Sequence, residues 1–335
     1  FGLGGAGTFS DGKLTTGVSH PWLPEVLKVL VECGAPEQIL TDAKPHVGTD
    51  ILRGVIETLV TRIQTAGGKV HTNQCVEKLG MGHGRLRSVS TPTETVETEV
   101  AILATGHSAR DTWQMLHSLG IELQPKPFQM GIRVEHPQEW LDNARYGDAA
   151  GHPALGAADY KLATRVHQTP VFSFCMCPGG VTIPTVHEPK HLAINGMSVS
   201  SRNSKYASSG LVVTLKPENY GGSDLDRCLS FQRGLEHLCY GAGGSDYAVP
   251  GQRLVDFAEG RASLLPLPES SYGFGVAAAR LDEILPPQLT VPMRGALSHF
   301  NDRIAGYLHP EALALAPESR ASSPIRLVRD KVTLE

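Results

Sequence analysis

Apolar residues recur at helical spacing near residue 50, and this pattern predicts a helix. They run from Ile51 to Ile63 at intervals of three and four residues. Thr49 and Asp50 stand where a helix cap is expected, and the pair Gly67–Gly68 gives an end signal. We therefore expect one amphipathic helix between these two signals.

A series of extended runs follows this helix. They are rich in β-branched or alternating apolar residues and lie at 69–73, 75–79, 85–91 and 99–104. The middle runs predict a small β-meander, and the apolar run 99–104 predicts a buried strand. This order of elements is typical of an α/β nucleotide-binding layer.

The pattern changes after about residue 126. Strand-like alternation occurs at 130–135, 160–166, 171–174 and 192–194, which predicts a separate sheet. From about 225 to 308 helices are expected instead. Their apolar stripes are Leu225, Leu229, Leu235 and Leu238 in one helix, and Leu297, Phe300, Ile304 and Leu308 in another.

Composition excludes several classes of protein. The 335 residues carry 30 Lys plus Arg against 34 Asp plus Glu, so there is no basic excess for nucleic acid. No apolar stretch approaches the roughly 20 residues of a membrane helix, so no membrane span is expected. Six cysteines without the spacing of a zinc module favour a reducing compartment. We expect a cytoplasmic protein, with an organelle as the alternative.

Two glycine-bearing turns are the strongest candidates for ligand binding. The first spans residues 4–14, where glycines allow a backbone to approach a ligand closely. A glycine turn with a Ser/Asp helix cap explains this segment equally well. The second turn is Ala104-Thr105-Gly106, at the end of the expected strand 99–104, where ligands of open α/β sheets bind. Any strand that enters a tight turn is the alternative there.

The succession of elements resembles the FAD-binding domain of flavoproteins built on the glutathione reductase plan. Longer strings resemble the mostly uncharacterised FAD-dependent dehydrogenases and oxidoreductases of that superfamily. These strings lie at 7–14, 44–50, 104–111, 126–128, 131–137, 158–162, 173–180 and 195–198. The resemblance implies an α/β fold with a discontinuous, incomplete FAD-binding domain (1–125 and 321–335) and an inserted α+β substrate domain (126–320). Residues 69–106 are then expected to share one layer with 1–20 and 321–335.

The resemblance also implies a cofactor and its ligands. FAD is the expected cofactor, NAD(P)H the expected electron donor and a small molecule the expected substrate. Residues matched to cofactor binding are Gly4, Gly5, Gly7, Thr8, Ser10, Asp11, Gly12, Lys13, Val76, Ala104, Thr105, Gly106 and His107. The family's first strand would precede Phe1 and its last flavin segment would follow Glu335, so the chain is expected to be truncated at both ends. The rival reading is a degenerate fragment that keeps the fold, binds no FAD and serves as a partner-binding module.

The sequence Cys175-Met-Cys177-Pro-Gly-Gly180 is the candidate for redox chemistry. Two cysteines at i and i+2 of a strand share a face and can cycle through a disulfide. Two buried structural cysteines beside a turn are the alternative. The string His187-Glu-Pro-Lys-His191 matches a zinc-protease pattern, but Pro189 argues against the helix that this pattern needs, and no metal is expected. The sequence leaves the substrate and the oligomeric state open.

Overall fold

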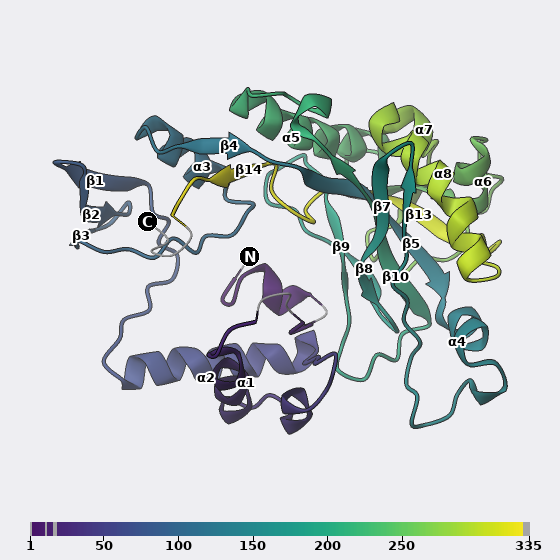
Figure 1. Cartoon of the computed structure of the whole chain (residues 1–335), viewed down its shortest axis with the longest axis horizontal. Helices are drawn as coiled ribbons and strands as arrows, with labels where there is room; N and C mark the ends of the chain where they lie inside the picture. The colour runs from purple at the N-terminus through teal and green to yellow at the C-terminus, as the bar shows by residue number, and fades with distance from the viewer. Residues whose placement is uncertain (1, 11, 16–18, 331–335) are drawn as a thin grey trace.

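The computed structural model describes residues 2–10, 12–15 and 19–330, and its largest described sheet is mixed and has seven strands. Figure 1 shows this sheet to the right of helices α1 (Leu23–Glu32) and α2 (Thr49–Thr65). The strand order is β12-β11-β13-β5-β10-β7-β6, with β11 and β12 parallel and the other pairs antiparallel. The strands are β5 (Phe128–Pro137), β6 (Ala163–Val166), β7 (Thr169–Cys177), β10 (Tyr206–Leu215), β11 (Val249–Arg253), β12 (Val276–Ala278) and β13 (Leu313–Glu318). The sheet expected after residue 126 is therefore present, and we call residues 128–318 the sheet body.

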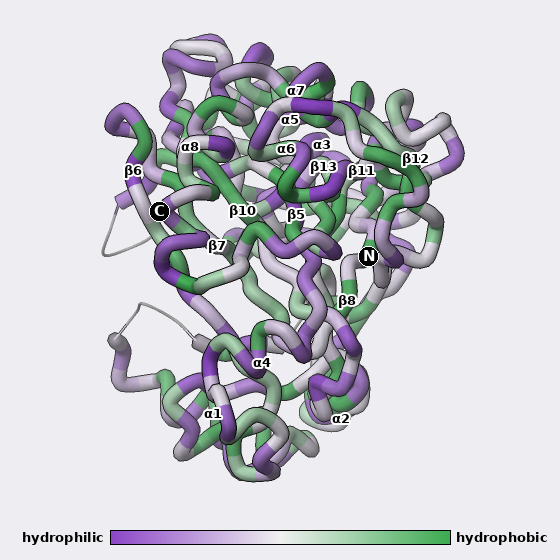
Figure 2. Tube along the Cα trace, turned by 90° about the vertical axis from the view of Figure 1, so that its right-hand side faces the viewer, coloured by the Kyte–Doolittle hydropathy of each residue, from purple (hydrophilic) through white to green (hydrophobic). Residues whose placement is uncertain are grey.

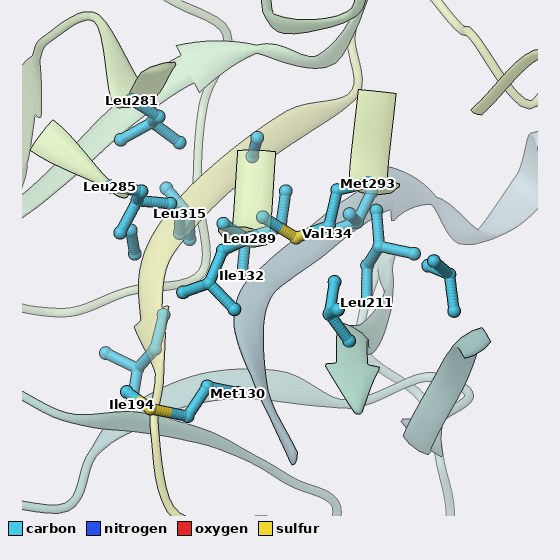
Figure 3. Packing of buried hydrophobic residues seen from close by; sticks show 14 of the residues in the cluster. Met130, Ile132, Val134, Ile194, Leu211, Leu281, Leu285, Leu289, Met293 and Leu315 are labelled. Atoms are coloured by element: carbon cyan, nitrogen blue, oxygen red, sulfur yellow. The ribbon is translucent and has the colours of Figure 1, made fainter. Parts of the chain in front are cut away.

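The two faces of this sheet differ in chemistry. Side chains of a strand alternate between faces, so Ile132 and Val134 of β5 point toward helix α8 (Pro287–Arg303), as Figure 3 shows. Arg133 and Glu135 point the other way, toward the hairpin of β8 (Val181–Pro184) and β9 (Ile194–Met197). The apolar face thus builds the core, and the opposite face carries buried charges.

Further helices surround the sheet body. They are α4 (Gln138–Tyr146), α5 (Leu225–Ala242), α6 (Leu254–Glu259) and α7 (Leu281–Ile284), with short 3₁₀ turns at Gly147–Ala149 and Pro217–Asn219. Helix α5 packs on β11 and β13. Of its predicted apolar stripe, Leu235 is buried, whereas Leu238 is 59% exposed, so the stripe is shorter than predicted. Figure 2 shows apolar positions running along β10 at the centre of the sheet.

The N-terminal region, which we define as residues 2–121, has its own small core. Helices α1 (Leu23–Glu32) and α2 (Thr49–Thr65) pack there with 3₁₀ turns at Ala6–Phe9 and Glu37–Leu40. The helix predicted near residue 50 is present, but its cap is Gly48, which has φ +88° and no room for a side chain. Asp50 does not cap the helix, because its carboxylate accepts hydrogen bonds from Ser200.

The two predicted strands of the meander are present, as β1 (Lys78–Gly82) and β2 (Arg85–Ser90). A third strand, β3 (Thr95–Glu97), pairs with β2 and was not predicted. The strands predicted at 69–73 and 99–104 are not formed, so these two predictions are wrong. Among the described residues no strand lies beside 99–104. Its apolar side chains therefore stay in solvent, and Ile102 is 92% exposed.

After helix α3 (Arg110–Ser118), strand β4 (Leu123–Pro125) pairs with β14 (Ile325–Leu327). The described end of the chain thus pairs with β4 in a separate two-stranded sheet. The strands of 69–106 form another sheet, so the expected layer of 69–106 with 1–20 and 321–335 is not found among the described residues. Residues 331–335 of that expectation lie outside the described part.

In the part of the chain that the structure describes, every helix is too short or too polar to cross a lipid bilayer.

Candidate functional site

A cavity of about 930 Å³ is lined jointly by the N-terminal region and the sheet body. The N-terminal region contributes residues 5–7, 104–111 and Gln114. The sheet body contributes His187, Glu188 and one face of α5, at positions 226, 229, 230 and 233. Sites of this size between two parts of a chain are the usual setting for cofactors and substrates.

The two predicted glycine-bearing turns meet at this cavity. Gly5, Gly7, Ala104, Thr105, Gly106 and His107 all line it. Gly5 and Gly106 have φ values of +64° and +79°, a backbone conformation that favours glycine. A Cβ atom added at Gly5, Gly7 or Gly106 would meet nothing within 4 Å. These peptides therefore face open space in which a flat ligand can lie against the backbone.

The other residues matched to cofactor binding do not line the cavity. Thr8 is buried, and its carbonyl accepts a hydrogen bond from Thr49 Oγ1 at 2.5 Å. Ser10 Oγ donates to the Gly7 carbonyl. Gly12 packs so closely on Gly48 that a Cβ there would lie 2.7 Å from its nitrogen. These contacts fix the backbone of the glycine-rich turn on the side that does not line the cavity. The remaining matched residues outside the lining are Gly4, Lys13 and Val76, and Asp11 lies outside the described residues.

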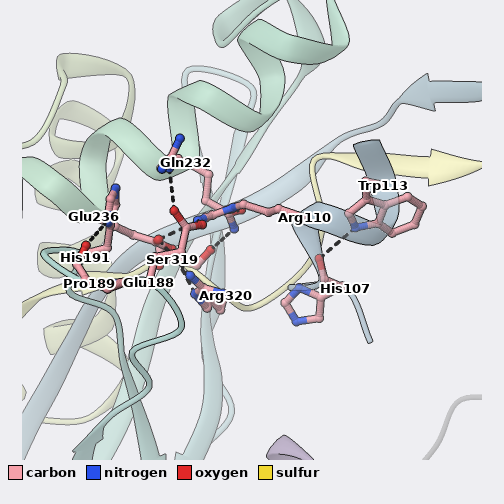
Figure 4. Close-up of polar contacts among 11 residues, drawn as sticks. His107, Arg110, Trp113, Glu188, Pro189, His191, Gln232, Glu236, Ser319 and Arg320 are labelled. Carbon is pink, nitrogen blue, oxygen red and sulfur yellow. Dashed lines mark hydrogen bonds and ion pairs between the residues drawn. The ribbon is translucent and has the colours of Figure 1, made fainter. Parts of the chain in front are cut away.

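A network of ion pairs supports one wall of the cavity, which Arg110, Glu188 and Arg233 line. Figure 4 shows Arg110 and Glu188 together with Glu236 and Arg320, which do not line the cavity. Arg110 at the start of α3 bonds Glu188 at 2.5 Å and the fully buried Glu236 of α5 at 3.0 Å. Glu188 also accepts from Arg233 at 2.6 Å, and Glu236 accepts from Arg320 at 2.9 Å. Each carboxylate thus bridges two guanidinium groups, which fixes α3 of the N-terminal region against the sheet body.

Sequence reasoning missed this wall. Arg110 lies inside the family-like string 104–111, but its partners are far away in sequence, so only the fold brings them together. The one available signal was helical spacing, since positions 226, 229, 230 and 233 lie on one face of α5. Arg110 Nε is buried without a hydrogen-bond partner among the described residues, which leaves one donor of this wall unused.

Two histidines line the cavity in their neutral form. Burial, then the charges of Arg320 and Arg110, lower the pKa of His187 to about 4. Burial, then Arg320 and Lys126, lower the pKa of His107. Neither imidazole is protonated to a large extent at pH 7, so each has a ring nitrogen that can accept a hydrogen bond. His187 does not lie in a helix, in agreement with the prediction that its zinc-protease pattern is a chance match.

Neither Cys175 nor Cys177 lines this cavity. Both stand at the end of β7, where Cys175 is partly exposed and Cys177 is buried. The lysine of the glycine-rich segment reaches them, because Lys13 Nζ donates to the Met176 carbonyl. The predicted segment and the predicted cysteines are therefore neighbours, although they do not share the cavity. No group of three or more potential metal ligands occurs among the described residues.

The cysteines lie next to a buried ion pair. Arg133 Nε donates to Glu318 at 2.8 Å, and both side chains are nearly fully buried. Burial raises the pKa of Glu318 to about 7, against the opposing attraction of Arg133. Burial alone would lower the pKa of Arg133, but the charge of Glu318 raises it. The guanidinium is charged and holds a fixed positive charge beside both thiols.

The chain matches a family model described as "FAD-dependent protein, C-terminal domain-like" over residues 127–321. It therefore belongs to this family of FAD-dependent proteins. A protein of Clostridium beijerinckii, described as uncharacterised, is 40% identical over 337 aligned residues. The alignment covers 98% of this chain and 62% of that protein, so the chain spans about three fifths of its relative's length.

Proposed function

We propose that the protein is an FAD-dependent oxidoreductase of the dehydrogenase type, and that its flavin binds in the 930 Å³ cavity. One observation carries this proposal. Two glycine-bearing turns, about 100 residues apart in sequence, line one cavity together with residues of the family-matched segment 127–321. The substrate is a small molecule whose identity stays open.

The residues present fit such a group. Gly5, Gly7 and Gly106 offer peptide surface without side chains, and their Cβ positions are open. These peptides would hold the cofactor, with Ala104, Thr105 and His107 beside them. When bound, a flavin supplies hydride or electron transfer, and the protein supplies orientation and electrostatics.

The residues of the wall have their own tasks. His187 and His107 are neutral and can accept a hydrogen bond from a substrate in the cavity. Arg110 lines the cavity, and Glu188 and Glu236 hold its guanidinium in place there. The network also covers one side of the cavity and limits access of water.

We also propose the finer parts of the family resemblance. They are a glutathione-reductase-type FAD-binding domain over 1–125 and 321–335 with an inserted substrate domain over 126–320, and redox catalysis by Cys175 and Cys177. NAD(P)H as electron donor stays a prediction, which the rate of flavin reduction by NADH and by NADPH tests.

The absorbance spectrum of the purified full-length protein tests the main proposal, because bound flavin gives a yellow protein with two visible bands. Gly7→Val adds a side chain where the protein leaves open space, so we expect an intact fold and FAD affinity at least about tenfold lower. Gly2→Val is the matched control, since its Cβ also meets nothing within 4 Å and Gly2 does not line the cavity.

Three results would contradict the proposal. A colourless protein that stays free of flavin after FAD is added would favour the rival reading, a non-catalytic partner-binding module. Equal FAD affinity of Gly7→Val and wild type would move the flavin away from this cavity. An equal loss in Gly2→Val would mean that the loss is not specific to the cavity.

A further inference from the structure

The end of strand β7 contains a β-bulge at the cysteines. In the pairing with β10, Cys177 lies opposite Ser208 and Phe174 lies opposite Gly210. Cys175 and Met176 therefore face a single residue, Ser209. Cys175 has φ +42°, a left-handed conformation that is rare for a side-chain-bearing residue. Bulges of this kind redirect side chains and occur next to functional sites.

Two cationic side chains from distant segments hold the bulge. Both terminal nitrogens of Arg133 lie 3.4 Å from the Cys175 carbonyl oxygen. Lys13 Nζ donates to the next carbonyl, that of Met176. A strained backbone persists only where its surroundings fix it, and here β5 and the glycine-rich segment do so.

The two thiols differ in access but interact with each other. Cys177 is fully buried, and its thiol donates to the Cys175 carbonyl at 3.3 Å. Gly196 packs directly on the Cys177 thiol, since a Cβ at Gly196 would lie 2.8 Å from the sulfur. Hydrogen bonding with the Cys175 side chain, and then burial, raise the pKa of Cys177, while Lys13 and Arg133 oppose the rise. Cys175 is the partly exposed member of the pair.

We propose that Cys175 and Cys177 form a reversible dithiol–disulfide couple, in which Cys175 is the sulfur that reacts first with a disulfide reagent. The Cys175 thiolate attacks the reagent disulfide R–S–S–R, a mixed disulfide forms and one R–S⁻ leaves and takes up a proton. Cys177 then gives up its proton, attacks the Cys175 sulfur and releases the second R–SH. Two protein thiols are oxidised to one disulfide, and one reagent disulfide is reduced to two thiols.

Formation of the disulfide should affect the glycine-rich segment as well. The ring that it forms contains Met176, whose carbonyl accepts a hydrogen bond from Lys13, so we expect oxidation to change the contact between the bulge and Lys13. This inference deepens the redox role proposed above for Cys175 and Cys177. It does not rest on flavin binding, because the chemistry needs a disulfide such as oxidised glutathione and no flavin.

The test is a redox titration of the flavin-free full-length protein. It is equilibrated in buffers of increasing ratio of oxidised to reduced glutathione, quenched in acid, alkylated and mapped by mass spectrometry. We expect the peptide with Cys175 and Cys177 to lose two hydrogen atoms reversibly. Cys75 is exposed and lies outside any C-x-C pair, so it serves as internal control and should only take up glutathione.

Two variants separate the roles of the two sulfurs. In Cys177→Ser the mixed disulfide on Cys175 cannot be resolved, so we expect it to accumulate at least about tenfold over wild type. In Cys175→Ser the buried Cys177 should stay unmodified. Cys228→Ser is the matched control, because it removes another buried thiol and should leave the titration unchanged.

The proposal fails if residues 175 and 177 stay as two free thiols in buffers that already modify Cys75. It also fails if wild type carries stable mixed disulfides at both positions. The unaltered wild-type chain decides these outcomes, so a variant that folds poorly does not obscure them. The visible spectrum of the double variant Cys175→Ser/Cys177→Ser with FAD tests the flavin proposal separately, since flavin binding needs neither thiol.

Discussion

The sheet body and the N-terminal region contain similar apolar runs, but they bury them to very different extents. In β5 the run from Met130 to Val134 has a strand on each side, and its apolar side chains are fully buried. The run 99–104 has no strand beside it among the described residues, and Ile102 is 92% exposed. An apolar pattern therefore shows that a segment can form a buried strand, but the segment is buried only where neighbouring strands pair with it.

The regions also differ in how they handle charge. The sheet body buries Arg133 with Glu318, where each charge depends on the other. The ion pairs formed between two residues of the N-terminal region are exposed, as between Lys28 and Glu25. Buried charges are costly unless paired, whereas exposed pairs contribute little. Substitutions that remove one partner of an ion pair should thus have larger effects at Arg133 and Glu318 than within the N-terminal region.

The largest effect is expected from Arg133→Met. This substitution leaves Glu318 buried without a counter-charge, so we expect the free energy of unfolding to fall by about 3–5 kcal/mol in urea titrations. The double variant Arg133→Met/Glu318→Leu should regain most of this loss. Lys28→Met breaks the exposed pair with Glu25 of the N-terminal region and should leave the free energy of unfolding nearly unchanged. An Arg133→Met protein as stable as this control would contradict the contrast between the regions.

The next effect compares the two cores directly. Leu211→Ala in the sheet body and Ile39→Ala in the small core remove side chains that are 0% and 1% exposed. Each substitution should lower the free energy of unfolding of its own region by about 2–5 kcal/mol. Native-state hydrogen exchange shows which amides each substitution affects. Leu211→Ala should weaken amide protection across the sheet, and Ile39→Ala should weaken it only within about 23–65. Equal loss of protection in β5 and β10 for both variants would mean that the two regions unfold as one unit.

A pH effect of about 2 kcal/mol is expected from His136 of the sheet body. Burial lowers its pKa to about 4, and its Nε2 lies 2.7 Å from the Tyr307 carbonyl oxygen. The folded state then binds fewer protons than the unfolded state between pH 6.5 and 4. Stability is therefore full above about pH 6.5 and is lost as the pH falls toward 4, by about 2 kcal/mol at pH 5.

The variant His136→Phe isolates this effect. Glu318 has a raised pKa and shifts stability in the opposite direction, but it does so in wild type and variant alike. The difference in unfolding free energy between the two proteins, measured at pH 7.5 and pH 5, should change by about 2 kcal/mol. If the difference in unfolding free energy between wild type and variant does not depend on pH, His136 is protonated to the same extent in the folded and the unfolded state.

The sequence predicted the local elements more reliably than their surroundings. The helix near residue 50, the meander and the strands β5 and β7 follow from periodicity that each segment carries by itself. The exposure of 99–104 could not be predicted, because it depends on which strands lie beside that run. The turns at Gly5–Gly7 and 104–106 carried a local glycine signal, whereas the wall of Arg110, Glu188 and Glu236 combines residues up to 126 positions apart.

The smallest effect concerns a contact that joins the two regions, between Lys13 and the carbonyl of Met176. Lys13→Met removes one partly exposed hydrogen bond, so its effect on stability should stay below about 1 kcal/mol. It also removes a positive charge near Cys177, so alkylation at the bulge should slow a few-fold.

Lys44→Met is the control, because Lys44 also joins the regions, through Asp159, but does not contact the bulge. If both variants slowed alkylation equally, looser docking of the N-terminal region would explain the effect. A slower rate in Lys13→Met alone assigns it to the charge at the bulge.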